Sequence, residues 1–72
     1  MTRLRVKEVA QQKGFSMRRL TKDAGVAYNT IRTIYKDPYR PVTMTTLKNI
    51  AAALQVPVSA LLEEVPEDTN NH

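Results

Sequence analysis

Apolar residues recur at helical spacing from the start of the chain. Val6, Val9 and Ala10 lie three or four positions apart, and Leu4 stands just upstream. This spacing predicts a helix over residues 4–13, which the glycine that follows would end.

Two more short helices are predicted on either side of Gly25, over residues 17–24 and 28–36. Their buried sides are marked by apolar pairs at helical spacing, Leu20 with Ala24 and Ile31 with Ile34. Helices of this length are marginal in water, so both must pack on the rest of the domain. A turn with a left-handed glycine lets the second helix cross the first steeply and project outward.

Beyond the predicted loop DPYRP, residues 37–41, the pattern indicates two further helices. The first is capped by Thr43 and buries a face made of Leu47, Ile50, Ala51 and Leu54. The last is short and begins at Pro57. No strand is predicted, because Pro57 interrupts the one segment with a period of two. The expected fold class is therefore all-α, with five short helices.

Length and composition favour one small domain over residues 1–65, followed by a disordered acidic tail, PEDTNNH, over residues 66–72. The chain of 72 residues contains no cysteine, and its single histidine is the last residue, so a disulfide framework is excluded and a metal site is not expected. No run reaches the ~18 apolar residues of a membrane-spanning helix, and the N-terminus does not resemble a signal peptide. We expect a cytoplasmic protein that does not bind a membrane.

The positive charge is concentrated in the first part of the chain. Residues 1–40 hold ten Lys and Arg against three Asp and Glu, whereas residues 41–72 hold one against four. This asymmetry favours a polyanionic partner, most simply nucleic acid. The alternative is a solvated basic face that only keeps a small domain soluble.

Catalytic chemistry is not indicated. Glu63 and Glu64 are neighbours on a predicted helix, where they cannot converge on one atom, and the chain has neither a glycine-rich phosphate loop nor a cluster of metal ligands. We therefore expect no enzyme, no catalytic residue, no metal or other cofactor, and no small-molecule ligand.

The outward face of the predicted helix over residues 28–36 carries groups that can read bases. In the DNA major groove, Asn bonds adenine, Arg bonds guanine, and a Thr methyl or an aromatic ring meets the thymine methyl. The residues on this face are Tyr28, Asn29, Thr30, Arg32 and Thr33.

From Phe15 to Leu62 the sequence resembles the Cro/CI-type helix-turn-helix family, also called the xenobiotic response element family. The resemblance lies in FSMRRLTKDAGVAYNTIRTIY, then Pro41, then VTMTTLKNIAAALQVPVSALL, over some two thirds of the chain. It implies a compact, five-helix, lambda repressor-like domain in which residues 28–36 form the recognition helix.

The same resemblance implies the contacts with double-stranded DNA. Base contacts are expected from Tyr28, Asn29, Thr30, Arg32 and Thr33, although Thr30 could instead support the turn and Arg32 could lie along phosphate or in solvent. Phosphate contacts are expected from Ser16, Met17, Arg18, Ala27, Lys36, Tyr39, Arg40 and Thr43. For Lys36, a favourable interaction with the helix dipole is an equal alternative.

Several residues depart from the family pattern. Met17 replaces a common Gln, so its DNA contact is in doubt, and Arg18 and Arg19 oppose the helix dipole unless phosphates lie nearby. An Arg–Glu pair of many relatives is replaced by Ala10 and Tyr35, and we expect the Tyr35 ring to lie over Ala10.

Two further departures concern polar groups at the helix crossing. Ala27 stands at a cap where Ser or Thr is usual, which leaves helix amides open to phosphate or to water. Thr21 replaces a usual Ala, and we expect its hydroxyl to bond a helix carbonyl one turn back.

The resulting functional hypothesis is a sequence-specific transcription regulator, most simply a repressor that binds a palindromic operator as a homodimer. Its dimer contacts are expected from Val58, Leu61, Leu62 and Val65. The alternative is a protein-interaction module, such as an antitoxin that docks on a partner protein. An RNA binder is a weaker third choice, because no aromatic stacking platform is visible.

Overall fold

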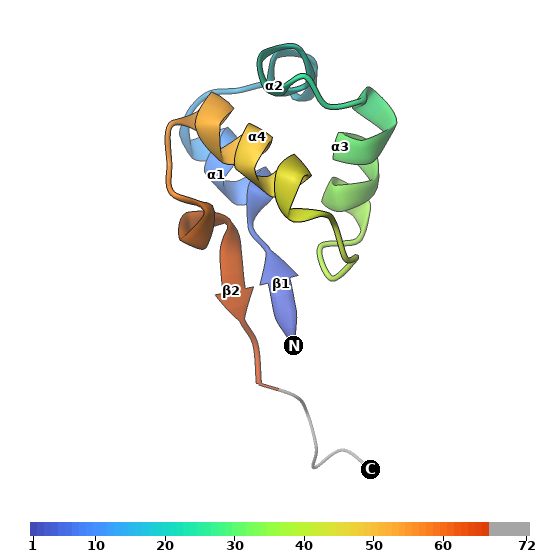
Figure 1. Ribbon diagram of the computed structural model, residues 1–72, viewed down its shortest axis with the longest axis vertical. Helices are drawn as coiled ribbons and strands as arrows, with labels where there is room; N and C mark the ends of the chain where they lie inside the picture. Colours follow the sequence, from blue (N-terminus) through green and yellow to red (C-terminus); the bar gives the residue numbers. More distant parts are fainter. Residues whose placement is uncertain (67–72) are drawn as a thin grey trace.

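The computed structural model describes residues 1–66, so the predicted tail lies outside the described residues except for Pro66. Four α-helices form the body of the domain (Figure 1). They are α1 (Val6–Gln12), α2 (Met17–Ala24), α3 (Tyr28–Lys36) and α4 (Met44–Leu54). A 3-10 helix, η1 (Val58–Leu61), and two strands, β1 (Thr2–Leu4) and β2 (Leu62–Glu64), complete the order β1-α1-α2-α3-α4-η1-β2.

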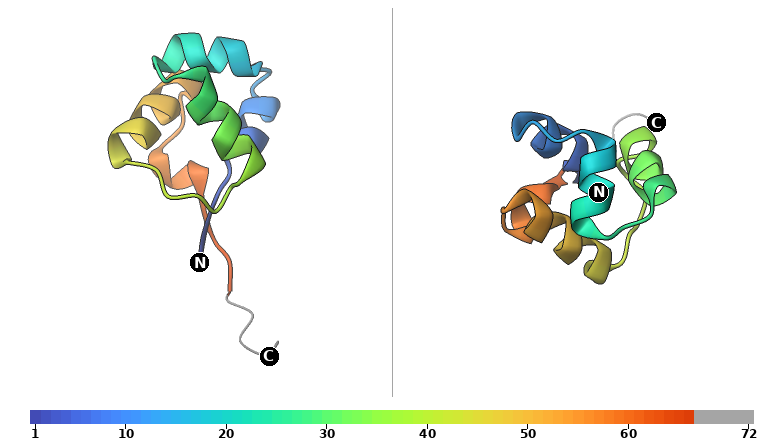
Figure 2. Two further views of the ribbon diagram at one scale, coloured as in Figure 1. Left: turned by 90° about the vertical axis from the view of Figure 1, so that its right-hand side faces the viewer. Right: turned by 90° about the horizontal axis from the view of Figure 1, so that it is seen from above.

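One apolar core joins all of these helices. Ile31 of α3, Leu20 of α2 and Ile50 of α4 are each fully buried. The helices surround this centre, with α2 crossing the top of the bundle, as two further views show (Figure 2). Burial of these side chains holds α2 and α3 in place, since each is too short to be stable alone.

The predicted boundaries of α2 and α3 are confirmed, whereas the first helix was predicted too long. Leu4 belongs to β1, so α1 begins at Val6. The N–H of Leu4 donates to the carbonyl of Pro38 at 2.7 Å, and that of Arg5 donates to the carbonyl of Leu61 at 2.8 Å. These bonds hold the first residues extended against distant parts of the chain.

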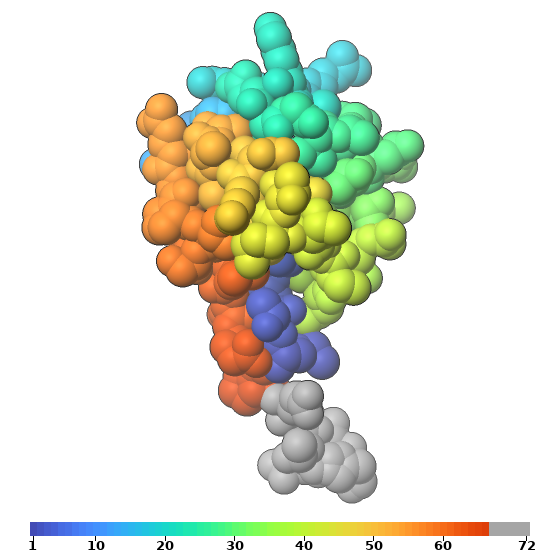
Figure 3. All heavy atoms as spheres, in the orientation of Figure 1, coloured from blue at the N-terminus to red at the C-terminus, as the bar shows by residue number. Residues whose placement is uncertain are grey.

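The fold is mostly helical as predicted, but the prediction that it has no strands was wrong. β1 and β2 pair antiparallel, with Thr2 opposite Glu64 and Leu4 opposite Leu62. Figure 3 shows the two segments side by side, extending from the base of the domain. The predicted fifth helix is only the single 3-10 turn of η1, because the chain becomes extended at Leu62 to enter β2.

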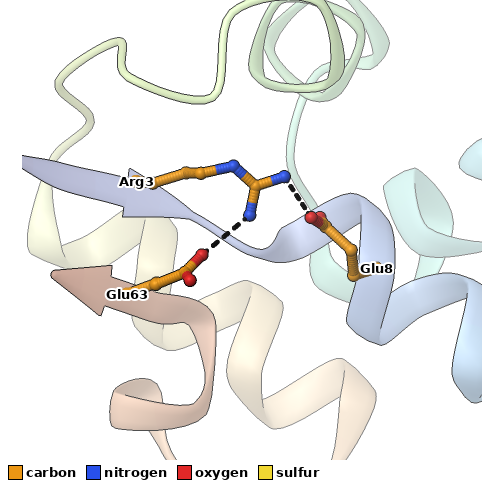
Figure 4. A network of polar contacts seen from close by, with 3 residues as sticks. All are labelled: Arg3, Glu8 and Glu63. Atoms are coloured by element: carbon orange, nitrogen blue, oxygen red, sulfur yellow. Dashed lines mark hydrogen bonds and ion pairs between the residues drawn. The ribbon is translucent and has the colours of Figure 1, made fainter. Parts of the chain in front are cut away.

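Arg3 fastens the strand pair to the first helix. Its guanidinium donates to Glu63 on β2 at 3.0 Å and to Glu8 on α1 (Figure 4). The hydrogen bond with Glu8 raises the pKa of Arg3. Burial by itself raises the pKa of Glu8, but the hydrogen bond from Arg3 and the backbone outweigh it and leave that pKa below its ordinary value.

Within residues 1–66, no helix combines the length and the apolar character that crossing a membrane requires.

Candidate nucleic-acid interface

The turn between α2 and α3 sets the direction of α3. Ser16 begins α2 by accepting a hydrogen bond from the Arg19 N–H at 3.1 Å. Gly25 ends it in the left-handed conformation, with φ of 67°, and its N–H donates to the Thr21 carbonyl at 2.9 Å. A left-handed residue is the common end of an α-helix, and glycine adopts it without the cost of a Cβ atom. The chain can therefore turn sharply and begin α3 three residues later.

α3 has a buried side and a polar side. Ile31 and Ile34 face the core and are 0% and 2% exposed. The five residues predicted to contact bases lie on the rest of the helix surface: Tyr28, Asn29 and Arg32 are exposed, while Thr30 and Thr33 are half-buried. The structure thus brings all five together on one outward surface, which we call the reading face.

Shallow hollows flank α3 on both sides. On the side of α2, a hollow is lined by Arg18, Thr21 and Tyr28. On the side of the loop after α3, another is lined by Thr30, Arg40, Thr43 and their neighbours. Two of the predicted phosphate-contacting cations, Arg18 and Arg40, therefore border the reading face from opposite sides.

The two adjacent arginines at the start of α2 differ in their surroundings. The guanidinium of Arg19 lies 3.6 Å from the Asp23 carboxylate and stacks over the Phe15 ring. Arg18 is exposed and forms no ion pair with any residue of 1–66. An intramolecular partner therefore accounts for Arg19, whereas the charge of Arg18 remains available to a ligand.

The carboxylates of residues 1–66 are all engaged within the domain, and none of them lies on α3. Glu8 and Glu63 bond Arg3, Glu64 bonds the terminal amino group, Asp23 pairs with Arg19, and Asp37 accepts from the Tyr39 N–H. The hydrogen bond from the amino group, and then that from Thr2, lower the pKa of Glu64. Asp37 keeps its negative charge, because its partner is an uncharged N–H. The exposed cations around the reading face, Arg18, Arg32, Lys36 and Arg40, nevertheless outnumber it, and this excess of positive charge attracts a polyanion.

The remaining predicted phosphate contacts occupy varied positions. Lys36 is exposed in the last turn of α3, and Tyr39 is 45% exposed on the following loop. Thr43 caps α4, since its hydroxyl accepts from the Thr46 N–H at 3.3 Å. Met17 is half-buried and packs against the core, which suits an apolar side chain.

Ala27 precedes α3 and provides no side-chain hydrogen bond to it. The side chain of Ala27 therefore does not cap the N-terminal amides of α3. Such amides, with the positive end of the helix dipole, form a suitable site for a phosphate oxygen.

The expectation for Thr21 was wrong. Its hydroxyl oxygen is buried and has no hydrogen-bond partner among residues 1–66. The helix crossing encloses the oxygen without bringing an acceptor or donor to it, so the residue carries the desolvation cost of an unpaired hydroxyl.

Tyr35 is half-buried and packs against the core cluster to which Ala10 belongs. Burial raises the pKa of its phenol. Ala10 and the Tyr35 phenol are both uncharged, so no charge is left unpaired there. That the Tyr35 ring lies over Ala10 stays a prediction.

Of the four residues predicted for a dimer interface, Leu61 is fully buried in the domain and cannot reach a partner. This correction follows from η1, which turns Leu61 toward the core. Val58, Leu62 and Val65 are half-buried. The N–H of Val65 donates to the carbonyl of Met1 at 2.8 Å, which extends the strand pairing by one residue.

An apolar groove of about 450 Å³ beside the strand pair was not predicted. Its walls come from β1, the loop after α3, α4 and β2, through Leu4, Tyr39, Val42, Leu47 and Leu62. No local sequence signal marks it, because the pairing of the chain's two ends creates it.

Comparison with known proteins agrees with this geometry. The family model of the Cro/C1-type helix-turn-helix DNA-binding domain matches residues 5–67. Among solved structures, the chain is similar to the N-terminal DNA-binding domain of the master biofilm regulator SinR from Bacillus subtilis. The two share 32% sequence identity and superpose with a TM-score of 0.72, over 88% of this chain and 91% of that one. The search of curated proteins gave no match. The chain belongs to the family of Cro/C1-type helix-turn-helix DNA-binding domains.

Proposed function

We propose that this DNA-binding transcription regulator is a repressor that binds a near-palindromic operator as a homodimer, with α3 of each copy in the major groove. The reading face carries the proposal. It presents amide, hydroxyl, phenol and guanidinium groups outward from a helix whose opposite side is fixed in the core. The major groove admits an α-helix, and these groups match the hydrogen-bonding and methyl groups of base edges.

Phosphate contacts would fix the orientation of the helix. Arg18 borders the reading face on one side and Arg40 borders it on the other, so each could approach a DNA strand beside the groove. The N-terminal amides of α3, which the side chain of Ala27 does not cap, could together bind a phosphate. Contacts of this kind position a protein on the duplex, while the base contacts provide specificity.

A single reading face touches few base pairs, so we propose a symmetric dimer on two half-sites about 34 Å apart. The half-buried Val58, Leu62 and Val65 are the proposed contacts, without Leu61. In this arrangement, the bound dimer would exclude other proteins from the promoter.

Selection from random-sequence duplexes tests the proposal, because it reports both the bases recognised and the spacing of half-sites. A two-fold symmetric motif with half-sites about one helical turn apart is expected. Affinity for the recovered duplex should fall steeply with salt, with log K decreasing by about 0.9 per neutralised phosphate.

Two outcomes would contradict the proposal in different ways. A flat salt dependence and no recovered motif would favour the protein-interaction module over a DNA regulator. A recovered motif without symmetry, together with a monomer in sedimentation at high protein concentration, would reject only the dimer. Activation of a reporter promoter that carries the motif would reject only repression.

A further inference from the structure

An internal hydrogen bond restricts what the reading face can recognise. The hydroxyl of Thr33 donates to the backbone carbonyl of Asn29, one turn earlier in α3, at 2.8 Å. The hydroxyl hydrogen is therefore already used. What Thr33 still offers to a base is its γ-methyl group and a lone pair of the oxygen.

Without that donor, Thr33 is poorly suited to guanine. Guanine presents only the acceptors N7 and O6 in the major groove, whereas thymine presents a methyl group that a Thr methyl can contact. The preference of Thr33 for thymine over guanine thus follows from the donation of its hydroxyl hydrogen to the Asn29 carbonyl.

The surroundings of Thr33 include apolar carbon that a methyl group could contact. Thr33 lines a shallow hollow of about 250 Å³ between α3 and the loop that follows it. Ile34 and Val42 contribute to the same hollow, together with Asn29, Thr30 and Arg40. A methyl group that enters beside Thr33 would meet aliphatic carbon and lose its contact with water, which is favourable.

Asn29 offers the opposite chemistry. Its side chain is exposed, and its amide group forms no hydrogen bond to any residue of 1–66. Both the donor and the acceptor of the amide are thus available, and this pair matches N7 and N6 of adenine.

The helix geometry relates the two readings. Side chains four residues apart on a helix have Cβ atoms about 5–6 Å apart. Successive base pairs are about 3.4 Å apart, so Asn29 and Thr33 would reach base pairs one or two steps from each other.

We infer that each half-site contains an adenine bonded by Asn29 and, one or two base pairs away, a thymine whose methyl group packs against Thr33. This inference rests on the proposed function, since it names the bases that the reading face would select.

Base analogues in the selected duplex test the thymine contact with the unaltered, full-length protein. Each thymine of a half-site is replaced in turn by uracil, which removes only the methyl group. One replacement should weaken binding about three- to fivefold, the effect of losing one buried methyl. A 5-methylcytosine in place of a cytosine at that position should bind better than cytosine itself.

Two matched variants assign this effect to Thr33. Thr33→Val keeps a methyl group and removes the hydroxyl, so it should still distinguish thymine from uracil. Thr33→Ser keeps the hydroxyl and removes the methyl, so its preference for thymine over uracil should be clearly smaller than that of the wild-type protein. Circular dichroism verifies that each variant is folded.

The adenine contact is tested in the same manner. Replacement of the adenine by 7-deazaadenine removes N7 and should weaken binding by the wild-type protein about tenfold, the effect of losing part of a bidentate contact. The same replacement should have no effect on Asn29→Ala.

The results separate the inference from the function on which it rests. If sequence-specific binding is found but no uracil replacement weakens it, or Thr33→Ser prefers thymine as strongly as the wild-type protein does, the inference is wrong and the proposed function stands. A recovered half-site that contains no A·T pair would likewise refute the inference and leave the proposed function standing. If no motif is recovered at all, the proposed function fails and the inference fails with it.

Discussion

The guanidinium of Arg19 lies over the ring of Phe15, with its central carbon 4.0 Å from the ring centroid. With the nearby Asp23 carboxylate, this contact gives Arg19 a structural role that its neighbour Arg18 lacks. The adjacent pair thus provides a matched comparison between a charge used within the fold and a charge available to DNA.

Arg18→Ala is expected to weaken DNA binding and to reduce the salt slope of log K by about 0.9, the value for one phosphate contact. Arg19→Ala should leave that slope nearly unchanged and lower the free energy of unfolding by about 0.5–1 kcal/mol, because it removes the cation–π contact. Salt titrations of binding and chemical denaturation measure the two effects. An unchanged slope for Arg18→Ala would contradict its phosphate contact.

Thr21→Val should stabilise the domain. It replaces the buried, unpaired hydroxyl with a methyl group of similar size. The expected gain is about 1 kcal/mol, which corresponds to a rise of about 4–8 °C in melting temperature. Thr21→Ser retains the hydroxyl and is the control, for which no gain is expected. A lower melting temperature for Thr21→Val would show that the hydroxyl has a partner in solution.

Gly25→Ala should destabilise the domain through backbone conformation alone. No atom lies within 4 Å of the place that an added Cβ would occupy, yet φ is +67°. The expected cost is about 1–2 kcal/mol.

Gln55 provides the reverse test, because it adopts φ of 59° at the end of α4. Gln55→Gly should stabilise the domain by up to about 1 kcal/mol. Thermal denaturation of both variants measures this, and changes of the same sign would refute the explanation.

Substitution of Ala27 separates helix capping from phosphate binding. Ala27→Ser and Ala27→Asp should each stabilise the fold by about 1 kcal/mol, since both side chains can cap α3. Only Ala27→Asp should weaken DNA binding, by about five- to tenfold, because its charge repels a nearby phosphate. Gln12→Asp, at an exposed position of α1, controls for the change in net charge. Equal affinities of Ala27→Asp and Gln12→Asp would argue against a phosphate at this cap.

Acid should destabilise the domain through Glu8 and Glu64. The pKa of each is lowered in the folded state from the ordinary 4.5, so the unfolded chain binds protons more readily. Their contribution is complete above pH 4.5 and is lost as the pH falls through the lowered values. The effect is small, since solvent screens both groups. Melting temperatures between pH 7 and pH 3 should fall less for the double variant Glu8→Gln, Glu64→Gln, and an equal fall would exclude these carboxylates as the cause.

Local signals were sufficient to predict α2, the turn at Gly25, α3 and the helix capped by Thr43. Their apolar spacing, caps and breakers lie within the segments themselves, and the packing of Leu20 and Ile31 agrees with that pattern. The choice of Tyr28, Asn29 and Arg32 as outward residues followed from the same periodicity.

The rest depended on contacts between distant residues. Leu4 fits a helix by spacing but is paired with Leu62, and strands of three residues are too short to show a period of two. The environment of Thr21 depends on how closely the helices cross, which no local pattern specifies. The partner of Arg19 could have been inferred from Asp23 four positions later, whereas the stacking on Phe15 required the chain's path before α2.

The pairing of β1 with β2 also affects how the molecule reaches its native state. Thr2 and Glu64 are 62 positions apart, so the pair closes a loop that includes every helix. Such a closure has a high entropic cost until the helices have brought the two ends together. The strand pair should consequently assemble after the rate-limiting barrier. Its contacts would then govern how slowly the folded domain opens, while the speed of folding is set by the helices that present the reading face.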